Sequence, residues 1–357
     1  MNLNDYGFTN DYISELDEQI RTAGWIPARV TAVHRERYQL VCEHGETYGR
    51  LKTKEYYGGV EAFPTTGDFV LIQYIENGDS QIVKTLPRRT FFSRKDPTPG
   101  RGEQAVAANF DTVFVVQSLN HDFNVKRLER YMTLAWQSGA EPVVLLTKAD
   151  LVEEYDSYLA RIMEVAPGVK TCVVSAKSGY GMEELEQFLQ PEKTVVFLGS
   201  SGVGKSSLVN ALAGKDIMDV NGIREDDSKG RHTTTHRQLV KLERGVMLID
   251  TPGMRELGMW DVSVGLGSAF SDVEQYFGKC KFSDCKHQTE PGCAIKAAIE
   301  SGVLSEARWR SYNNLKREAK YSDDKSTFLR DKAKWHKELA KNNKRIKTDK
   351  KKYGEKY

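Results

Sequence analysis

Residues 199–206, with the sequence GSSGVGKS, have the residue types and spacing of a phosphate-binding loop. They follow the apolar run TVVFL and open the helical segment SSLVNALAG. In such a loop the glycines let backbone N–H groups surround a β-phosphate, Lys205 reaches the β- and γ-phosphate oxygens, and the Ser206 hydroxyl binds Mg²⁺. We expect nucleotide contacts from Gly199, Ser200, Ser201, Gly202, Val203, Gly204, Lys205, Ser206 and Ser207, with Lys205 also in a catalytic role.

A second phosphate-side element follows the apolar run VMLID, which ends in the sequence DTPG. Asp250 at the end of this run would lie beside the metal ion, and the backbone N–H of Gly253 would lie near the γ-phosphate. The two motifs together predict a P-loop nucleoside triphosphatase.

Two further motifs indicate which base is bound. TKAD ends the apolar run EPVVLL, SAK ends the run TCVV, and the residues involved are Thr147, Lys148, Ala149, Asp150, Ser175, Ala176 and Lys177. In GTPases the Asp of such a pair accepts both N–H donors of guanine. Adenine reverses that pattern, and each unpaired buried group costs about 1–3 kcal/mol. The sequence therefore favours GTP and GDP over adenine nucleotides, although Thr147 stands where Asn is more usual.

The elements that must position these motifs alternate between strand and helix. Apolar runs predict strands, with helices between them at about 124–138, 152–165, 181–189 and from Lys205. This is typical of a mostly parallel sheet with helices on both faces, where ligands bind at the carboxyl ends of the strands. Upstream, five short alternating runs between residues 25 and 89 predict a small β-barrel, either OB-like or SH3-like. An amphipathic helix is expected at about residues 4–23.

A metal site is predicted near the C-terminus. Cys280, Cys285, His287 and Cys293 supply three thiolates and one imidazole within a short segment, which is a complete ligand set for one structural Zn²⁺. Cys42 and Cys172 lie in apolar strand contexts and are interpreted as small core residues.

Composition limits the remaining possibilities. With 357 residues and 39% apolar content the chain is expected to form two or three domains. The N-terminus has no signal-like segment and the apolar runs are too short for a membrane span, so a cytoplasmic protein without a membrane partner is expected. Residues 306–357 hold 18 Lys and Arg against 8 Asp and Glu, a net +10 in a chain whose total is +2. This end is either a solvated helix or a surface that binds RNA phosphates.

The order of the motifs is TKAD, SAK, GSSGVGKS, GRHTTT and DTPG, whereas ordinary GTPases begin with the phosphate loop. This order indicates a circular permutation. Together with PTTGDFV, LPRRTFFSRKD and the zinc segment, it resembles the RsgA (YjeQ/YloQ) family of GTPases that assist late maturation of the small ribosomal subunit. The resemblance implies the 30S subunit and its 16S rRNA as partners and subunit-stimulated GTP hydrolysis. A monomer is expected.

The same resemblance implies a multidomain α/β architecture: an N-terminal OB-like β-barrel, a circularly permuted P-loop GTPase domain and a C-terminal zinc-binding helical domain. The expected boundaries are an N-terminal extension at 1–24, the barrel at 25–92, a linker at 93–104, the GTPase domain at 105–265, the zinc domain at 266–320 and a basic tail at 321–357.

The expected hydrolysis residues lie between the phosphate loop and DTPG. Met254 stands where many GTPases have a Gln that orients water, and the resemblance assigns this part to His232. It also implies that Thr233 or Thr234 closes on Mg²⁺ and the γ-phosphate, with Thr234 taken as the catalytic and magnesium-binding residue. The alternatives are that His232 is an ordinary loop residue and that Arg231 serves as an internal arginine finger.

Two functions from different classes fit these motifs. The first is a GTPase that acts as a timer on the maturing 30S subunit. The second is a nucleotide-gated RNA-binding or RNA chaperone module in which hydrolysis is incidental. A metabolic P-loop kinase is disfavoured by TKAD together with SAK.

Overall fold

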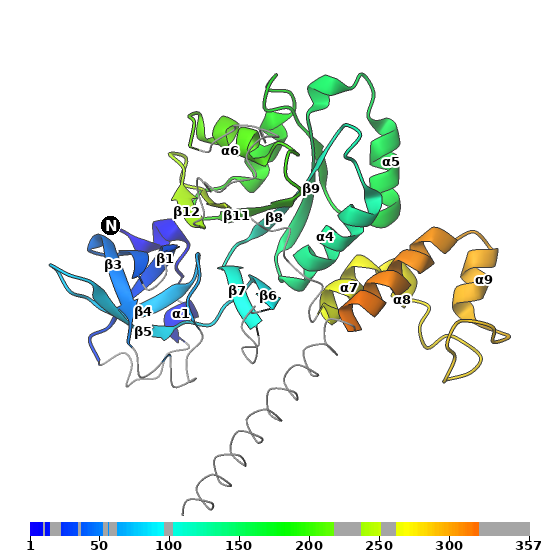
Figure 1. The fold of residues 1–357 in the computed structure, drawn as a ribbon, viewed down its shortest axis with the longest axis horizontal. Helices are drawn as coiled ribbons and strands as arrows, with labels where there is room; N and C mark the ends of the chain where they lie inside the picture. The colour runs from blue at the N-terminus through cyan, green and yellow to red at the C-terminus, as the bar shows by residue number, and fades with distance from the viewer. Residues whose placement is uncertain are drawn as a thin grey trace, which may run out of the picture.

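The computed structural model describes residues 1–9, 11–14, 23–34, 37–52, 56, 63–95, 103–217, 237–250 and 262–320. The predicted hydrolysis residues Arg231, His232, Thr233 and Thr234, as well as Gly253, Met254 and the tail at 321–357, lie outside these ranges. Figure 1 shows a β-barrel at one end of the molecule, a central sheet covered by helices, and a small helical region carrying α9 at the other end.

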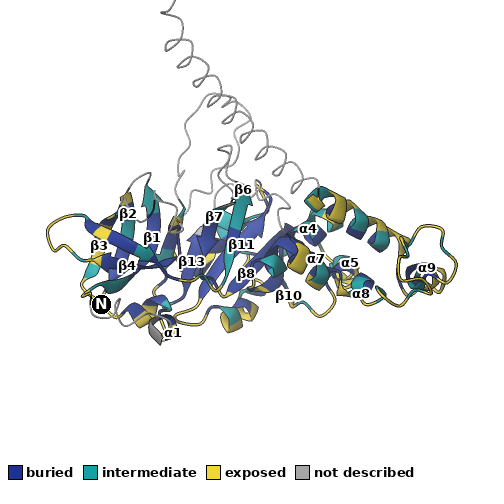
Figure 2. Cartoon of the chain, turned by 90° about the horizontal axis from the view of Figure 1, so that it is seen from below, coloured by how far each residue is buried: buried dark blue, intermediate teal, exposed yellow. Residues whose placement is uncertain are grey.

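Eleven strands of the described residues form one hydrogen-bonded sheet, in the order β10-β9-β8-β11-β13-β12-β1-β2-β3-β5-β4. Its central part contains the parallel strands β8 (Thr112–Ser118), β9 (Glu141–Thr147), β10 (Thr171–Val173), β11 (Thr194–Gly199) and β13 (Met247–Asp250), with the antiparallel β12 (Gln238–Lys241) beside them. The parallel strands β8, β9 and β11 are buried on both faces, which explains their nearly continuous apolar sequences (Figure 2). The predicted α/β class is confirmed.

Helices cover both faces of this sheet. Successive strand residues point to opposite sides, so neighbouring residues pack against different helices. Val115 packs in the cluster that contains α4 (Val125–Gln137) and α5 (Asp156–Val165), whereas Val116 packs in the cluster that contains η3 (Met182–Phe188) and α6 (Lys205–Ala213). The predicted helices at 124–138 and from residue 205 agree with α4 and α6.

Two helix predictions differ from the structure. The segment expected at 181–189 is the 3₁₀ helix η3, and α5 begins at Asp156 instead of about residue 152. The later start follows from the short 3₁₀ turn η2 (Ala149–Leu151), which holds Asp150 at the end of β9.

The barrel consists of β1 (Ile26–His34), β2 (Arg37–Cys42), β3 (Gly45–Leu51), β4 (Phe69–Gln73) and β5 (Ser80–Thr85). It closes in the order β1-β2-β3-β5-β4 through pairing of β4 with β1, and β3 runs parallel to β5. This is the five-stranded Greek-key arrangement of an OB barrel, which decides between the two alternatives left by the sequence.

The N-terminal segment is not one continuous helix from residue 4. It forms the 3₁₀ helix η1 (Leu3–Tyr6), and the chain then turns at Gly7, where the positive φ of 75° ends the helix. The short α1 (Asp11–Ser14) follows. Tyr6 and Tyr12 are buried in the large core cluster together with Phe69 of the barrel and Ile249 of β13.

The predicted linker at 93–104 overlaps two strands. β6 (Phe91–Lys95) and β7 (Glu103–Ala108) pair as an antiparallel ribbon that leads from the barrel into β8. Phe92 of this ribbon stacks on Phe110, with 4.8 Å between the ring centroids.

The C-terminal region contains α7 (Ser263–Ala269), α8 (Ser271–Glu274), α9 (Ala294–Glu300) and a helix at 306–320. Arg308 joins this last helix to two others. Its Nη1 lies 2.8 Å from Glu129 Oε1 on α4, and its Nε lies 3.0 Å from Asp272 Oδ2 on α8.

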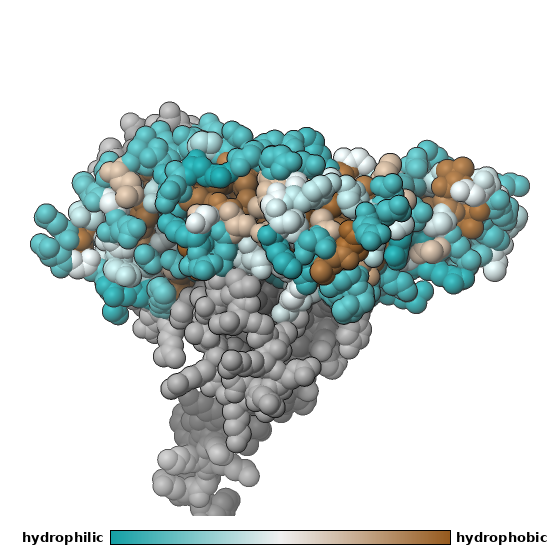
Figure 3. Space-filling model, turned by 90° about the horizontal axis from the view of Figure 1, so that it is seen from above, coloured by the Kyte–Doolittle hydropathy of each residue, from teal (hydrophilic) through white to brown (hydrophobic). Residues whose placement is uncertain are grey.

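None of the described helices is both long and apolar enough to cross a membrane. On the face shown in Figure 3, hydrophilic side chains predominate and hydrophobic ones gather in separate small groups.

Candidate nucleotide and metal sites

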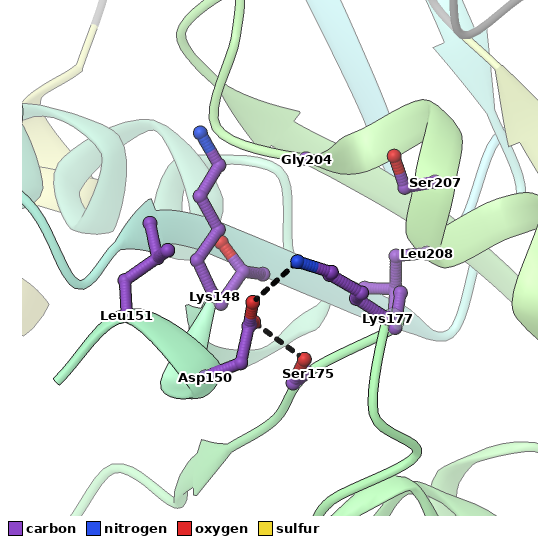
Figure 4. Close-up of a pocket in the computed structure, with 10 residues that line it drawn as sticks. Lys148, Asp150, Leu151, Ser175, Lys177, Gly204, Ser207 and Leu208 are labelled. Carbon is purple, nitrogen blue, oxygen red and sulfur yellow. Dashed lines mark hydrogen bonds and ion pairs between the residues drawn. The ribbon is translucent and has the colours of Figure 1, made fainter. Parts of the chain in front are cut away.

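A cavity of about 270 Å³ lies at the carboxyl ends of β9 and β10, beside the start of α6. TKAD ends β9 and SAK follows β10, and because these parallel strands are neighbours, both motifs reach the same edge of the sheet. The lining residues are Thr147, Lys148, Asp150, Leu151, Ser175, Ala176, Lys177, Gly204, Ser207 and Leu208 (Figure 4). The structure thus brings the two base-reading motifs and the phosphate loop together, as the sequence predicts.

Asp150 presents its carboxylate to this cavity with two partners. The Ser175 hydroxyl donates to Oδ1 at 2.6 Å, and Lys177 Nζ lies 3.9 Å from Oδ2. The hydrogen bond from Ser175 is the main cause that lowers the pKa of Asp150 below its ordinary value. The carboxylate is therefore ionised at neutral pH and able to accept the N–H donors of guanine.

Thr147 and Lys148 tie this base pocket to the phosphate loop. The buried Thr147 hydroxyl lies against two backbone carbonyls, those of Val203 in the loop and of Gln117 at the end of β8. Lys148 Nζ donates to the carbonyl of Gly202 at 2.7 Å. Thr147, which stands where Asn is more usual, thus makes a buried contact between the end of β9 and the phosphate loop.

The phosphate loop connects β11 to α6, as its sequence predicts. α6 begins at Lys205, so its N-terminal N–H groups face the loop. Lys205 Nζ donates to the carbonyls of Gly199, at 2.8 Å, and of Ser200, which keeps its charge at the loop where phosphates bind in such sites. Ser206 and Ser207 are partly buried on the first turn of α6.

Asp250 is the last residue of β13, the strand that pairs with β11. Its backbone therefore reaches the same edge of the sheet as the phosphate loop, and its side chain is outside the described set. The roles of Asp250, Gly253, His232, Thr233 and Thr234 remain predictions.

The zinc ligands predicted from sequence converge. Their four ligand atoms, on Cys280, Cys285, His287 and Cys293, lie within 4.8 Å of one another. His287 Nδ1 lies 3.4 Å from the sulfurs of Cys280 and Cys293 and 3.6 Å from that of Cys285. Tetrahedral zinc places nitrogen and sulfur ligands roughly 3.5 Å apart, so the residues fit the ion and leave no open position.

Glu290 supports this cluster and is not signalled by the ligand spacing. Its carboxylate accepts hydrogen bonds from the backbone N–H groups of Lys286, Gln288 and Thr289 at 2.9–3.0 Å. Backbone hydrogen bonds, with that of its own N–H the largest cause, hold the pKa of Glu290 at about 2. The only sequence signal was an acidic residue between the third and fourth ligands.

The two remaining cysteines are core residues, as expected. Cys42 lies in the barrel core and Cys172 in the sheet core. Burial raises the pKa of the Cys172 thiol to about 11, which keeps it protonated.

A parallel sheet with a phosphate loop before α6, a pocket at Asp150, and TKAD and SAK motifs that precede the phosphate loop in the chain define a circularly permuted P-loop GTPase. Comparison with known proteins agrees. A family model described as RsgA GTPase matches residues 85–260. Small ribosomal subunit biogenesis GTPase RsgA 2 of Listeria monocytogenes is 47% identical over 92% of both chains. RsgA of Methanosarcina acetivorans is 44% identical over 74% of this chain and 72% of its own.

Solved structures support the same assignment. YjeQ from Thermotoga maritima superposes with a TM-score of 0.60 at 27% identity, covering 82% of this chain and 97% of its own. YloQ, a circularly permuted GTPase, has a TM-score of 0.60 at 24% identity over 84% of this chain and 96% of its own, a likeness of fold. The chain belongs to the RsgA family of small ribosomal subunit biogenesis GTPases, and it is a GTP hydrolase.

Proposed function

We propose that this protein binds the small ribosomal subunit in its GTP state, hydrolyses GTP to GDP and phosphate there, and is then released, which assists late maturation of the subunit. The observation that carries the nucleotide part is the cavity at Asp150, joined to the phosphate loop through Thr147 and Lys148. The names of the relatives point to the subunit.

The chain's own residues divide the chemistry. Asp150 reads the guanine edge, with Ser175 holding its carboxylate ionised. Lys205 and the N-terminus of α6 bind the phosphates. Ser206, Asp250 and Thr234 or Thr233 would hold Mg²⁺, which neutralises phosphate charge when bound. His232 would orient the attacking water in place of the usual Gln.

The partner surface belongs to the barrel, the zinc region and the basic C-terminus. We propose 16S rRNA as the contacted part of the 30S subunit, since clustered Lys and Arg neutralise phosphates. One structural Zn²⁺ would keep the loop at 280–293 folded. We propose that the protein acts as a monomer in the cytoplasm.

Sedimentation with purified 30S subunits tests the proposal. The protein should pellet with 30S subunits in a non-hydrolysable GTP analogue and remain mostly in the supernatant with GDP, and 50S subunits should not capture it. Equal pelleting with both nucleotides would contradict GTP-dependent binding to the subunit. It would favour an RNA-binding module in which hydrolysis is incidental.

A further inference from the structure

The barrel turn at residues 65–68, TTGD, lies where three parts of the chain meet. Thr65 Oγ1 donates to the carbonyl of Val106 at 3.1 Å, and the N–H of Ala108 donates to the carbonyl of Thr66 at 3.0 Å, so the turn is fixed to β7. The Thr66 hydroxyl points elsewhere. It donates to the backbone carbonyl of Arg237 at 3.2 Å.

Residue 237 has a particular place in the chain. It immediately precedes β12, and the segment at 218–236, which carries the predicted hydrolysis residues, ends there. β12 pairs with β13, in the register Gln238 opposite Asp250, and β13 leads into DTPG. The contact made by Thr66 therefore lies next to the start of β12 and beside the end of β13, the strand that leads into DTPG.

The barrel also continues the central sheet at this point. β1 pairs antiparallel with β12, with Ala32 opposite Gln238. At the other end of β12, Lys241 Nζ lies 3.7 Å from Asp5 Oδ2 and 4.7 Å from the centroid of the Tyr6 ring. β12 is thus contacted at its first residue by the barrel and at its last by the N-terminal segment.

Buried hydrogen bonds and close packing hold the turn in place. Asp68 is fully buried, and its carboxylate accepts from the Thr65 N–H at 2.7 Å and from Arg88 at 2.8 and 2.9 Å. Gly67 has φ of +93°, and a Cβ there would lie 2.0 Å from the Ala108 carbonyl oxygen and 3.0 Å from Ile249 Cδ1. The backbone of the turn therefore lies directly against the Ala108 carbonyl of β7 and the Ile249 side chain of β13.

Arg29 of the barrel reinforces the same junction. Its guanidinium is buried and donates to the Gly67 carbonyl at 3.3 Å, the Asn109 carbonyl at 2.7 Å and Thr194 Oγ1 at 3.0 Å. These hydrogen bonds join the turn to the residues at the starts of β8 and β11. Arg29 thus adds direct hydrogen bonds between the barrel and the central sheet at this turn.

We propose that Thr66 is a positioning residue for GTP hydrolysis: its hydroxyl fixes the backbone at residue 237 and so transmits the position of a subunit-bound barrel to the strands that carry the phosphate-side segments. The proposal rests on the proposed function, in which the subunit stimulates hydrolysis. Thr66 touches no nucleotide in this role. It acts through Arg237 and β12.

The test compares Thr66→Val with Thr66→Ser, which keeps the hydroxyl, and with Thr31→Val as a matched control. Thr31 is a buried threonine of β1 whose hydroxyl has no hydrogen-bond partner among the residues that the structure describes. Thr66→Val should lower the maximal 30S-stimulated GTP turnover by about three- to ten-fold, the rate equivalent of one hydrogen bond. Turnover without subunits and the 30S concentration for half-maximal stimulation should not change. Thr66→Ser and Thr31→Val should match the wild type.

Amide hydrogen exchange provides a second readout that needs no ribosome. In Thr66→Val, residues 237–241 should exchange faster than in the wild type, and in Thr31→Val they should not. The positioning role would be overturned by unchanged hydrogen exchange at β12 in Thr66→Val, or by an equal loss of 30S-stimulated turnover in Thr66→Val and Thr66→Ser. A parallel fall in the unstimulated turnover of Thr66→Val would also overturn it. If the wild type itself shows no stimulation by 30S subunits, the proposed function fails. Normal stimulation of both wild type and Thr66→Val rejects only the role of Thr66.

Discussion

The Thr147 hydroxyl contacts the backbone carbonyl of Val203, so the strand that leads to Asp150 is joined directly to the phosphate loop. The same hydroxyl lies 3.2 Å from the Gln117 carbonyl, and its single proton is shared between the two acceptors. A threonine thus connects the base and phosphate halves of the site, where the more usual residue is Asn.

Thr147→Val keeps the shape of the side chain and removes the hydroxyl. We expect the affinity for GDP to fall by about three- to ten-fold, because one buried hydrogen bond contributes roughly 0.5–1.5 kcal/mol. Isothermal titration calorimetry measures this directly, and Thr147→Ser should bind like the wild type. Wild-type affinity in the Val variant would show that the contact does not support nucleotide binding.

Asp150→Asn should weaken GTP binding and shift the preference toward xanthosine triphosphate. An amide in place of the carboxylate can pair with the 2-oxo group of xanthine and leaves a guanine N–H donor unpaired. Competition binding with the two nucleotides is the measurement, with the exposed Asp156→Asn as a control that should leave the preference unaltered. A variant that still prefers GTP would remove Asp150 from base recognition.

The zinc cluster should hold about one ion per chain, given its four ligands. Cys285→Ala should lose the ion and unfold mainly the C-terminal region, since zinc can contribute about 10 kcal/mol or more to the folding of such a segment. Elemental analysis of tag-free protein is the measurement. Cys172→Ala, in the sheet core, should keep the full zinc content, and Glu290→Gln should release zinc to a chelator faster than the wild type does. A wild-type protein purified without zinc would contradict the assignment.

Arg308→Met should lower the free energy of unfolding by about 3–5 kcal/mol, because it leaves the buried Glu129 carboxylate without its charged partner. Arg310→Met breaks the exposed pair with Glu306 and should cost at most about 0.5 kcal/mol. Urea denaturation distinguishes the two. Similar losses in both variants would mean that the Arg308 network does not hold the last helix against α4.

His232→Ala should leave GTP affinity near that of the wild type and lower 30S-stimulated turnover by about 10²–10⁴-fold if the imidazole orients or deprotonates the water. Lys205→Ala should instead reduce binding and turnover together. His121→Ala, at an exposed histidine outside the site, serves as the matched control. Normal 30S-stimulated turnover in the His232 variant would mean that Arg231 or a ribosomal group orients the attacking water.

The sequence predicted those parts of the site whose positions follow from short motifs and from the ends of strands. Thr147, Ser175 and Gly199 end or follow parallel strands, and a parallel sheet must bring such residues to one edge. The zinc ligands lie close together in the chain, so their spacing was sufficient. The order of motifs identified the permutation without any structure.

Contacts between distant segments could not be predicted. The hydrogen bond from Thr66 to Arg237 and the pair Arg308–Glu129 join residues more than a hundred positions apart, and nothing in local periodicity specifies them. The helix predicted at about residues 4–23 was wrong at its start, because the left-handed turn at Gly7 ends η1 and separates it from the short α1. Tyr12 of α1 is buried in the core.

Control of GTP hydrolysis by the small subunit is tested most directly by measuring steady-state GTP turnover while purified 30S subunits are titrated in, with 50S subunits in a parallel series. Turnover should be slow for the protein alone, rise many-fold and saturate with 30S subunits, and stay slow with 50S subunits. A turnover rate that does not change with 30S concentration would contradict the proposed function and leave the protein as a nucleotide-gated RNA-binding module.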